Sequence, residues 1–287
     1  MRHAACSLLL ASLLLPLRVD GGEVREVSLG VDPGVTAGAS YWEGERDSPA
    51  VLVLHGFLQT RNFPTVRRLA EALAENGVTV LLPTLALGVD GRSQSLACEA
   101  IHTHDMHTDV DEIRRWVDWL YVRAGRPVVP VGHSAGSIQI LAYLLATPGA
   151  PVREAGLISL TYFGDARGGR ETPRDAAAAE AALRRGDDSL HSYGLNYCAS
   201  YVTTPGRYLS YYRWSGPVML EAISRVHVPL SVIYGMKDDR IDRPWLAQLQ
   251  GRGVGVRPVH GANHFFDQTH EFDLLENVEA LLEGVRR

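Results

Sequence analysis

The 287-residue chain has no stripe of lysine and arginine, no apparent internal repeat, few cysteines and no long transmembrane-type apolar run. Its basic residues are dispersed and its formal net charge is -5, which argues against nucleic acid as a default partner. The composition, 46% hydrophobic and 21% charged, is that of an ordinary globular protein large enough to bury a sizeable core. One domain with an insertion, or two domains, would fit this length.

The first 22 residues differ from the rest of the chain. Met1-Arg2-His3 is a short basic start, and residues 8–17 are almost wholly apolar. That run is too short to span a bilayer comfortably and is typical of a secretory signal peptide. We therefore predict that residues 1–22 are a signal peptide and that the protein is exported, periplasmic or secreted, with no stable membrane span once mature. Cleavage near Val19-Asp20-Gly21 is the best candidate, and an uncleaved leader that anchors the protein to a membrane is the alternative.

Only two of the three cysteines, Cys98 and Cys198, would remain after removal of the leader. In an oxidising compartment an even pair can form one disulfide. A Cys98–Cys198 disulfide and two buried thiols both stay open at this point.

Short apolar runs alternate with segments of helical periodicity through most of the chain. Strands are predicted at residues 50–54, 78–82, 128–132, 155–162, 230–234 and 254–259, and helices at 64–76, 105–123, after Ser134 and at 271–285. Residues 23–43 predict two further short strands that form an antiparallel edge. Strands that alternate with helices predict an α/β fold, with a mostly parallel sheet covered on both faces.

Residues 163–226 break this alternation and contain no convincing buried strand. Thr172-Pro173 begins an alanine-rich helix that runs to Arg185, and many tyrosines follow. The pattern predicts a helical cap inserted over the carboxyl edge of the sheet, between core segments 23–162 and 227–287. The tyrosines could line a substrate cleft or could join the cap to the core.

The pentapeptide Gly132-His133-Ser134-Ala135-Gly136 joins a predicted strand to a predicted helix. Glycines at this spacing allow a sharp strand-to-helix turn that leaves the serine hydroxyl projecting, as in a nucleophile elbow. A tight turn that carries a solvent-facing serine is the alternative. The strand and helix on either side favour Ser134 as a nucleophile.

A serine nucleophile needs a base, and the base needs a partner that fixes its tautomer. His264 follows the last predicted strand and precedes the final helix, so it reaches the same sheet edge as Ser134. Asp238 lies just beyond the preceding strand and is the preferred acid, ahead of Asp239 and Asp242. The order serine, acid, histidine is the one expected for this kind of fold.

Two backbone amides are predicted to stabilise the oxyanion. One is the Ala135 N–H and the other is the Phe57 N–H, in the turn after the strand at residues 50–54. Gly56 lets that turn form, and His55 is expected to position it rather than to transfer protons. The residues predicted to line a substrate cleft are Leu58, His133, Tyr162, Phe163 and Phe265.

These motifs together resemble the α/β-hydrolase family. His55-Gly56, the Gly132-x-Ser134-x-Gly136 elbow, the Gly235-x-x-Asp238 segment and the Gly-x-Asn-His264 loop occur in the family's order, and the resemblance runs from about residue 50 to the C-terminus. It implies a serine hydrolase fold with a catalytic triad. It does not imply a substrate, because the family includes esterases, lipases, thioesterases, peptidases and non-catalytic members. The serine disfavours the dehalogenase and epoxide hydrolase branches, which carry aspartate there.

We therefore expect a serine hydrolase that acts on a small-molecule carboxylic ester through an acyl-enzyme on Ser134, without a cofactor. A thioesterase or a serine peptidase of the same fold is the alternative within hydrolases. A non-catalytic binding protein that keeps the fold is the alternative from another class.

A second cluster of polar residues precedes the helix predicted at 105–123. Its imidazole and thiol groups are ligand types that suit zinc, but no tetrahedral pattern is complete. We expect no metal site there and interpret the cluster as a loop whose histidines form hydrogen bonds or face solvent. Its members are Cys98, Glu99, His102, His104 and His107.

Overall fold

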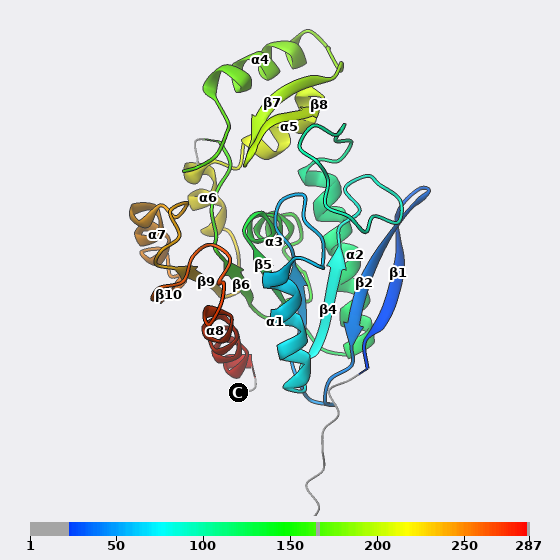
Figure 1. The fold of residues 1–287 in the computed structure, drawn as a ribbon, viewed down its shortest axis with the longest axis vertical. Coiled ribbons are helices and arrows are strands. Elements are labelled where there is room, and N and C mark those ends of the chain that lie inside the picture. The colour runs from blue at the N-terminus through cyan, green and yellow to red at the C-terminus, as the bar shows by residue number, and fades with distance from the viewer. Residues whose placement is uncertain (1–22, 165–166, 286–287) are drawn as a thin grey trace, which may run out of the picture.

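In the computed structural model, residues 23–164 and 167–285 are described, and they are built around an eight-stranded sheet (Figure 1). The predicted signal peptide, residues 1–22, lies outside the described residues. The strands lie in the order β1-β2-β4-β3-β5-β6-β9-β10. Their bounds are β1 Arg25–Asp32, β2 Val35–Trp42, β3 Ala50–Leu54, β4 Thr79–Thr84, β5 Val128–His133, β6 Ala155–Ile158, β9 Leu230–Gly235 and β10 Gly255–Val259.

The sheet is antiparallel at one edge and parallel elsewhere. β1 pairs with β2 and β2 with β4 in antiparallel register, whereas the pairs from β4 to β10 are parallel. The predicted antiparallel edge and mostly parallel sheet are therefore confirmed. One strand is shorter than predicted: β6 ends at Ile158, because Ser159 takes a left-handed conformation with φ of 49° that turns the chain out of the extended form.

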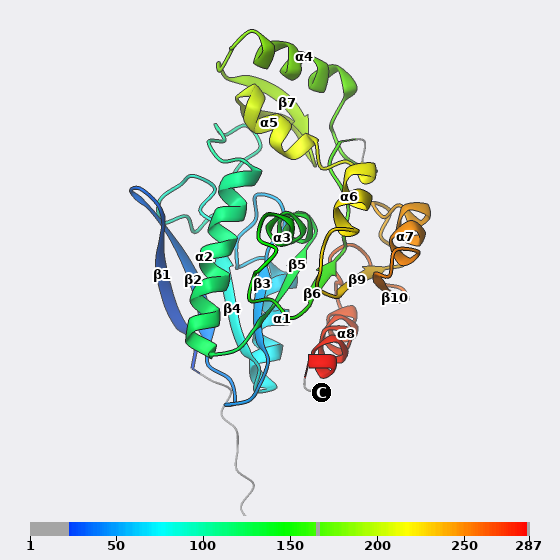
Figure 2. The ribbon, with the colours of Figure 1, turned by 180° about the vertical axis from the view of Figure 1, so that it is seen from behind.

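Helices cover both faces of the sheet, as the sequence predicts. α1 (Pro64–Glu75) and α8 (His270–Val285) cover one face (Figure 1), and α2 (Met106–Ala124) and α3 (Ala135–Ala146) cover the other (Figure 2). α7 (Arg243–Gln250) connects β9 to β10.

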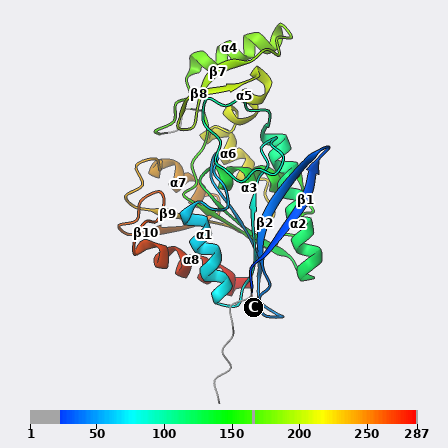
Figure 3. The same cartoon turned by 45° about the vertical axis from the view of Figure 1, so that its right-hand side comes forward.

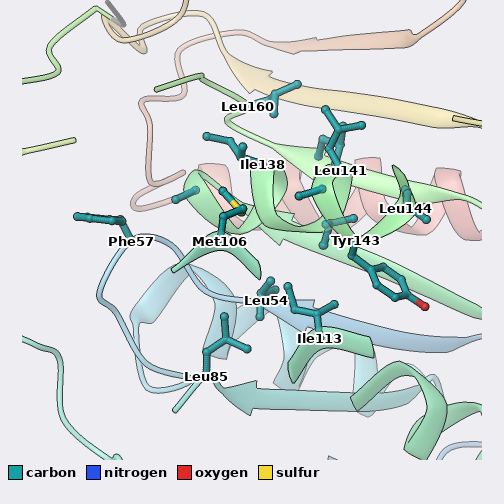
Figure 4. Close-up of a cluster of buried hydrophobic side chains, with 14 of the residues drawn as sticks. Leu54, Phe57, Leu85, Met106, Ile113, Ile138, Leu141, Tyr143, Leu144 and Leu160 are labelled. Carbon is teal, nitrogen blue, oxygen red and sulfur yellow. The ribbon is translucent and has the colours of Figure 1, made fainter. Parts of the chain in front are cut away.

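Alternate residues of the buried strands supply the two hydrophobic cores. In β3, Val51 and Val53 pack with α1 and α8, whereas Leu52 and Leu54 pack with α2 and α3. Figure 4 shows the α2/α3 side, where Ile113 lies next to Leu54 and the side chains of Ile138, Leu141 and Leu144 on α3 belong to the same cluster. Within the described residues, no helix combines the length and the apolar character needed to cross a membrane.

The segment between β6 and β9 forms a separate layer beyond the carboxyl ends of the parallel strands (Figure 3). Its elements are α4 Pro173–Arg184, β7 His191–Leu195, β8 Cys198–Thr203, α5 Pro205–Tyr212 and α6 Gly216–Ile223. The prediction of a purely helical insertion is wrong, because β7 and β8 form an antiparallel hairpin. The hairpin strands are rich in serine, tyrosine and threonine, and their apolar alternation is too weak to mark them.

The hairpin is tied to the loop that precedes α2. Ile101 forms a parallel bridge with Val202, and the His102 amide donates to the Val202 carbonyl at 2.8 Å. Cys98 and Cys198 are joined by a disulfide, so of the two alternatives left open by the sequence the structure has the cross-link. The insertion is therefore fixed to the core at a second place, far from its two chain connections.

Replacing both Cys98 and Cys198 by serine should lower the free energy of unfolding by about 2–4 kcal/mol, because the cross-link restricts the unfolded chain. Urea denaturation of the wild type with and without reductant measures the same quantity. The double variant is the matched control, since reductant should leave its midpoint unchanged. An identical midpoint for oxidised and reduced wild type would contradict the prediction.

Candidate active site

The Ser134 turn is enforced by close backbone packing on both sides. Ser134 lies between β5 and α3 with φ of 55° and ψ of -123°, a conformation that few non-glycine residues adopt. A Cβ on Gly132 would lie 2.5 Å from the Gly136 carbonyl carbon, and a Cβ on Gly136 would lie 2.5 Å from the His55 oxygen. Both positions therefore require glycine, as the elbow interpretation assumed.

Three predicted residues from three loops form a hydrogen-bonded line. His264 Nε2 lies 3.0 Å from Ser134 Oγ, and His264 Nδ1 lies 2.6 Å from Asp238 Oδ2. All three are buried, with Ser134 the most accessible at 9% exposure. If Nδ1–H donates to the carboxylate, Nε2 is left as the acceptor that can take the serine proton.

The alternative acids occupy other places. Asp239 is exposed. Asp242 caps α7 by accepting the Trp245 amide at 3.1 Å and also accepts the Tyr162 hydroxyl at 3.0 Å. The structure thus brings Asp238, and neither of its neighbours, to His264.

Backbone contacts place the histidine loop next to the elbow. The His264 carbonyl accepts the Ser159 hydroxyl and the His133 Nε2–H, both at 2.9 Å. A Cβ on Gly235 would lie 2.4 Å from the Ala262 oxygen, so glycine lets the loops after β9 and β10 pack together. The carboxylate and the imidazole are held by this packing of their loops.

The predicted oxyanion turn runs directly beside Ser134. A Cβ on Gly56 would lie 3.4 Å from the Ser134 Cβ. Ala135 is the first residue of α3, so its N–H has no acceptor inside the helix. Neither this amide nor that of Phe57 donates to another group among the described residues. Both predicted donors are therefore without an acceptor among the described residues.

His55 forms hydrogen bonds within the turn that follows β3 and just after β4, and none with Ser134. Its Nδ1–H donates to the Gly56 carbonyl at 2.9 Å, and its Nε2 accepts the Leu85 amide at 3.1 Å. Burial, reinforced by the Arg92 charge, lowers the His55 pKa from 6.5 to about 3. His55 is therefore neutral at physiological pH and acts as a structural link between the ends of β3 and β4.

Arg92 supports the same turn and was not predicted from the sequence. Its guanidinium, 5% exposed, donates to four carbonyl groups, including those of Leu58 at 3.3 Å and Gln59 at 2.7 Å. Burial lowers its pKa to about 10, so it keeps its charge at neutral pH. Nothing in the surrounding sequence distinguishes this arginine from an exposed one.

An open cleft lies above Ser134, and its lining differs from the prediction. Of the predicted lining residues only Tyr162 lies there. The residues that line the cleft are Ser134, Thr161, Tyr162, Arg167, Gly168, Gly169, Glu171, Asn196, Tyr197, Arg240 and His264.

The other four predictions of cleft lining are wrong for identifiable reasons. Leu58, Phe163 and His133 are each buried to 2% exposure or less, and Phe163 packs edge-on against the Phe57 ring. His133 instead points to the His264 carbonyl, away from the cleft. Phe265 is half-buried and lines a different hollow beside α1, and the Arg240 guanidinium lies 5.4 Å from the centre of its ring.

Two buried neutral histidines should make the fold sensitive to acid. Burial lowers the pKa values of His55 and His133 from 6.5 to about 3, and the nearby His264 adds to the effect at His133. Between about pH 3 and pH 6.5, these two imidazoles bind protons in the unfolded chain but not in the folded chain. The contribution of these two histidines to the free energy of unfolding should therefore fall as pH drops from about 6.5 towards 3, by about 1.4 kcal/mol per pH unit for each histidine.

Urea denaturation at several pH values between 4 and 7, a range set by these shifts, measures this slope. His133→Gln keeps an N–H donor but removes the proton site, so its slope should be shallower than that of the wild type. His227→Gln, at an exposed position, is the matched control and should keep the wild-type slope. Equal slopes for the wild type and His133→Gln would contradict the account.

The second polar cluster is held by hydrogen bonds and the disulfide. His102 donates from Nε2 to the Cys98 carbonyl at 3.2 Å, and His104 Nδ1 lies 3.2 Å from Asp109 Oδ1. Tyr211 donates its hydroxyl to Asp109 Oδ2 at 2.5 Å. Across residues 23–164 and 167–285, no group of three or more His, Cys, Asp or Glu side chains is arranged to hold a metal ion.

Comparison with known proteins identifies the family. The sequence profile described as "Alpha/beta hydrolase family" matches residues 51–275, which include the elbow and the Asp238 and His264 loops. The chain belongs to the alpha/beta hydrolase family. This hydrolase has no significantly similar sequence among curated proteins.

Solved structures with the same fold resemble this hydrolase at low sequence identity. A thioesterase domain from the curacin biosynthetic pathway is 19% identical, with a TM-score of 0.62 over 91% of this chain and 99% of that one. Est1E from Butyrivibrio proteoclasticus, with ferulic acid bound, is 15% identical, with a TM-score of 0.66 over 91% and 100%. A monoacylglycerol lipase from Paleococcus ferrophilus is 16% identical, with a TM-score of 0.60 over 91% and 98%. At these identities the likeness shows the fold alone.

Proposed function

We propose that this alpha/beta hydrolase is a serine hydrolase that cleaves a carboxylic ester through an acyl-enzyme on Ser134. The observation that carries the proposal is the line of hydrogen bonds from Ser134 through His264 to Asp238, beside two available backbone amides. Nucleophilic acyl transfer needs a nucleophile, a base, an acid that orients the base and donors for the oxyanion, and a candidate for each lies in that line or beside it.

In the proposed reaction, Ser134 Oγ attacks the acyl carbon while His264 Nε2 takes its proton. Asp238 stabilises the imidazolium, and the Phe57 and Ala135 amides bind the oxyanion. His264 then gives its proton to the departing alcohol oxygen, and the C–O ester bond breaks. Water, deprotonated by the same imidazole, attacks the acyl-enzyme, releases the carboxylic acid and restores the Ser134 hydroxyl.

A set of chromogenic substrates tests the reaction class. Para-nitrophenyl esters of increasing acyl length, an acyl thioester and an aminoacyl anilide differ in the group that must leave. We expect turnover of the short esters by the wild type. Preferred turnover of the thioester or the anilide would favour a thioesterase or a peptidase instead. Ligand binding without turnover of any substrate, retained in Ser134→Ala, would favour a non-catalytic binding protein.

We further propose that the protein is exported by its N-terminal leader. The Cys98–Cys198 disulfide supports an oxidising compartment, where such bonds persist. The N-terminal sequence of protein recovered from the host's periplasm or medium tests this proposal. Cleavage near residue 21 is expected, whereas a membrane-bound protein that keeps residues 1–22 would favour the uncleaved anchor.

A further inference from the structure

Two arginines line the cleft above Ser134 in a chain whose overall charge is negative. Arg240 follows the Asp238 loop, and Arg167 comes from the segment that enters the insertion. Glu171 is the carboxylate among the lining residues, and its Oε1 accepts the Asn196 amide at 2.9 Å. The lining therefore carries more positive than negative charge.

Arg240 is held in place by packing at both ends of its side chain. Its guanidinium lies 5.4 Å from the centre of the Phe265 ring, and that ring packs edge-on against His264. A Cβ on Gly168 would lie 3.7 Å from Arg240 Cγ, so the backbone at Gly168 passes beside its stem. The guanidinium is thus positioned within the cleft before any ligand binds.

No ion pair of Arg240 or of Arg167 is found within 4.0 Å in the described part of the chain. The arginine ion pairs found there involve other residues. The backbone amide of Arg240 donates to Asp238 Oδ1 at 3.0 Å, but that bond does not use the guanidinium. A guanidinium carries five N–H donors in a fixed fork that matches a carboxylate.

The Arg240 charge also acts on Tyr197, another residue that lines the cleft. Burial raises the Tyr197 pKa and the Arg240 charge opposes that rise, so the two residues interact electrostatically. The Tyr197 hydroxyl in turn donates to the Phe57 carbonyl at 3.0 Å, beside the predicted oxyanion amide. An anionic group held by Arg240 would therefore lie within the cleft that contains the reacting ester.

We propose that the substrate is an ester that carries a carboxylate on its acyl or its alcohol portion, bound by Arg240 with Arg167 as a second cation. This inference rests on the proposed function and adds the substrate class. Arg240 is a specificity-determining residue in this scheme, and Ser134, His264 and Asp238 carry out the chemistry.

Matched esters separate the two positions of the carboxylate. Para-nitrophenyl hemiglutarate and para-nitrophenyl valerate have acyl chains of equal length that differ in terminal charge. Para-acetoxybenzoate and para-acetoxybenzamide differ in charge on the leaving group. We expect the wild type to prefer the charged member of one pair in kcat/KM by about tenfold or more, the effect of a single charge-assisted hydrogen bond. The pair in which the charged ester is preferred shows whether Arg240 binds the acyl or the alcohol portion of the substrate.

Substitutions at Arg240 test whether this residue causes the preference for the charged ester. Arg240→Gln should lower the charged-to-neutral ratio by about tenfold, and Arg240→Lys should restore part of it, because lysine keeps the charge but not the fork. Arg252→Gln removes the same charge from an exposed turn outside the cleft and should keep the wild-type ratio. No preference in either pair, or a ratio that Arg240→Gln leaves unchanged, would overturn the proposal.

A binding measurement separates this inference from the proposed function. Calorimetric titration of Ser134→Ala requires no turnover, and it compares monomethyl glutarate with methyl valerate and para-acetoxybenzoate with para-acetoxybenzamide. Tighter binding of the charged ester, lost when Arg240→Gln is added, would support the inference even if no ester is hydrolysed. Equal binding of the charged and the neutral ester in both pairs would overturn it even if neutral esters are good substrates.

Discussion

Replacing Ser134 by alanine is expected to lower kcat on a para-nitrophenyl ester by about 10⁶-fold. The variant keeps the oxyanion amides and the cleft but loses the oxygen that forms the acyl bond. The fold should survive, because Ser134 Oγ contacts His264 and no backbone group. Initial rates, with the unfolding midpoint as a check on folding, measure the effect.

Ser192→Ala is the matched control for this substitution. Ser192 lies exposed on the hairpin of the insertion, where it pairs with Ser200 at 2.8 Å. The rate of this variant should equal that of the wild type. If Ser134→Ala kept activity within about tenfold of the wild type, the acyl-enzyme mechanism would be contradicted.

Replacing Gly136 by alanine should damage both the fold and the reaction. The new methyl group would lie 2.5 Å from the His55 oxygen and 3.0 Å from the Leu54 oxygen, so backbone must move. We expect a loss of about 3 kcal/mol in the free energy of unfolding. Because the shift separates α3 from the oxyanion turn, kcat/KM should fall by about 10²-fold.

Gly149→Ala is the control for the Gly136 substitution. A Cβ at Gly149 meets no atom within 4 Å, so stability and rate should stay near wild-type values. Urea denaturation and ester kinetics of both variants make the comparison. Equal stability of the two variants would show that the elbow does not require glycine at position 136.

The central part of the site could be predicted because local patterns and sheet topology agree. Gly-x-Ser-x-Gly between a strand and a helix defines a turn, and parallel strands bring the ends of β5, β9 and β10 to one edge. That reasoning placed Ser134, Asp238 and His264 together without any distance information. The buried strands could be predicted as well, because each is a short continuous hydrophobic run.

The rest of the site depends on contacts that sequence patterns do not encode. The β7–β8 hairpin is stabilised by pairing with residues 101–102 and by the disulfide, so its weak alternation did not reveal it. Arg92 and Arg240 look like ordinary surface arginines in the sequence. Only tertiary packing buries Arg92 under the oxyanion turn and aims Arg240 into the cleft.

Errors in the predicted cleft lining have the same origin. Leu58, His133 and Phe163 lie close in sequence to functional loops, but a neighbouring residue often points the other way. Their side chains entered the core, and residues from the insertion, such as Asn196 and Tyr197, took the cleft positions. Only the structure shows how the inserted segment lies over the edge of the sheet, and therefore which of its residues reach the cleft.

Covalent labelling by a fluorophosphonate probe shows directly whether Ser134 is an activated nucleophile. Such a probe reacts with an activated serine, and peptide mass spectrometry locates the adduct. The account predicts stoichiometric labelling of Ser134 in the folded protein and loss of labelling in His264→Ala, which removes the base. A folded wild-type sample that stays unlabelled, or that carries the adduct on another serine, would contradict it.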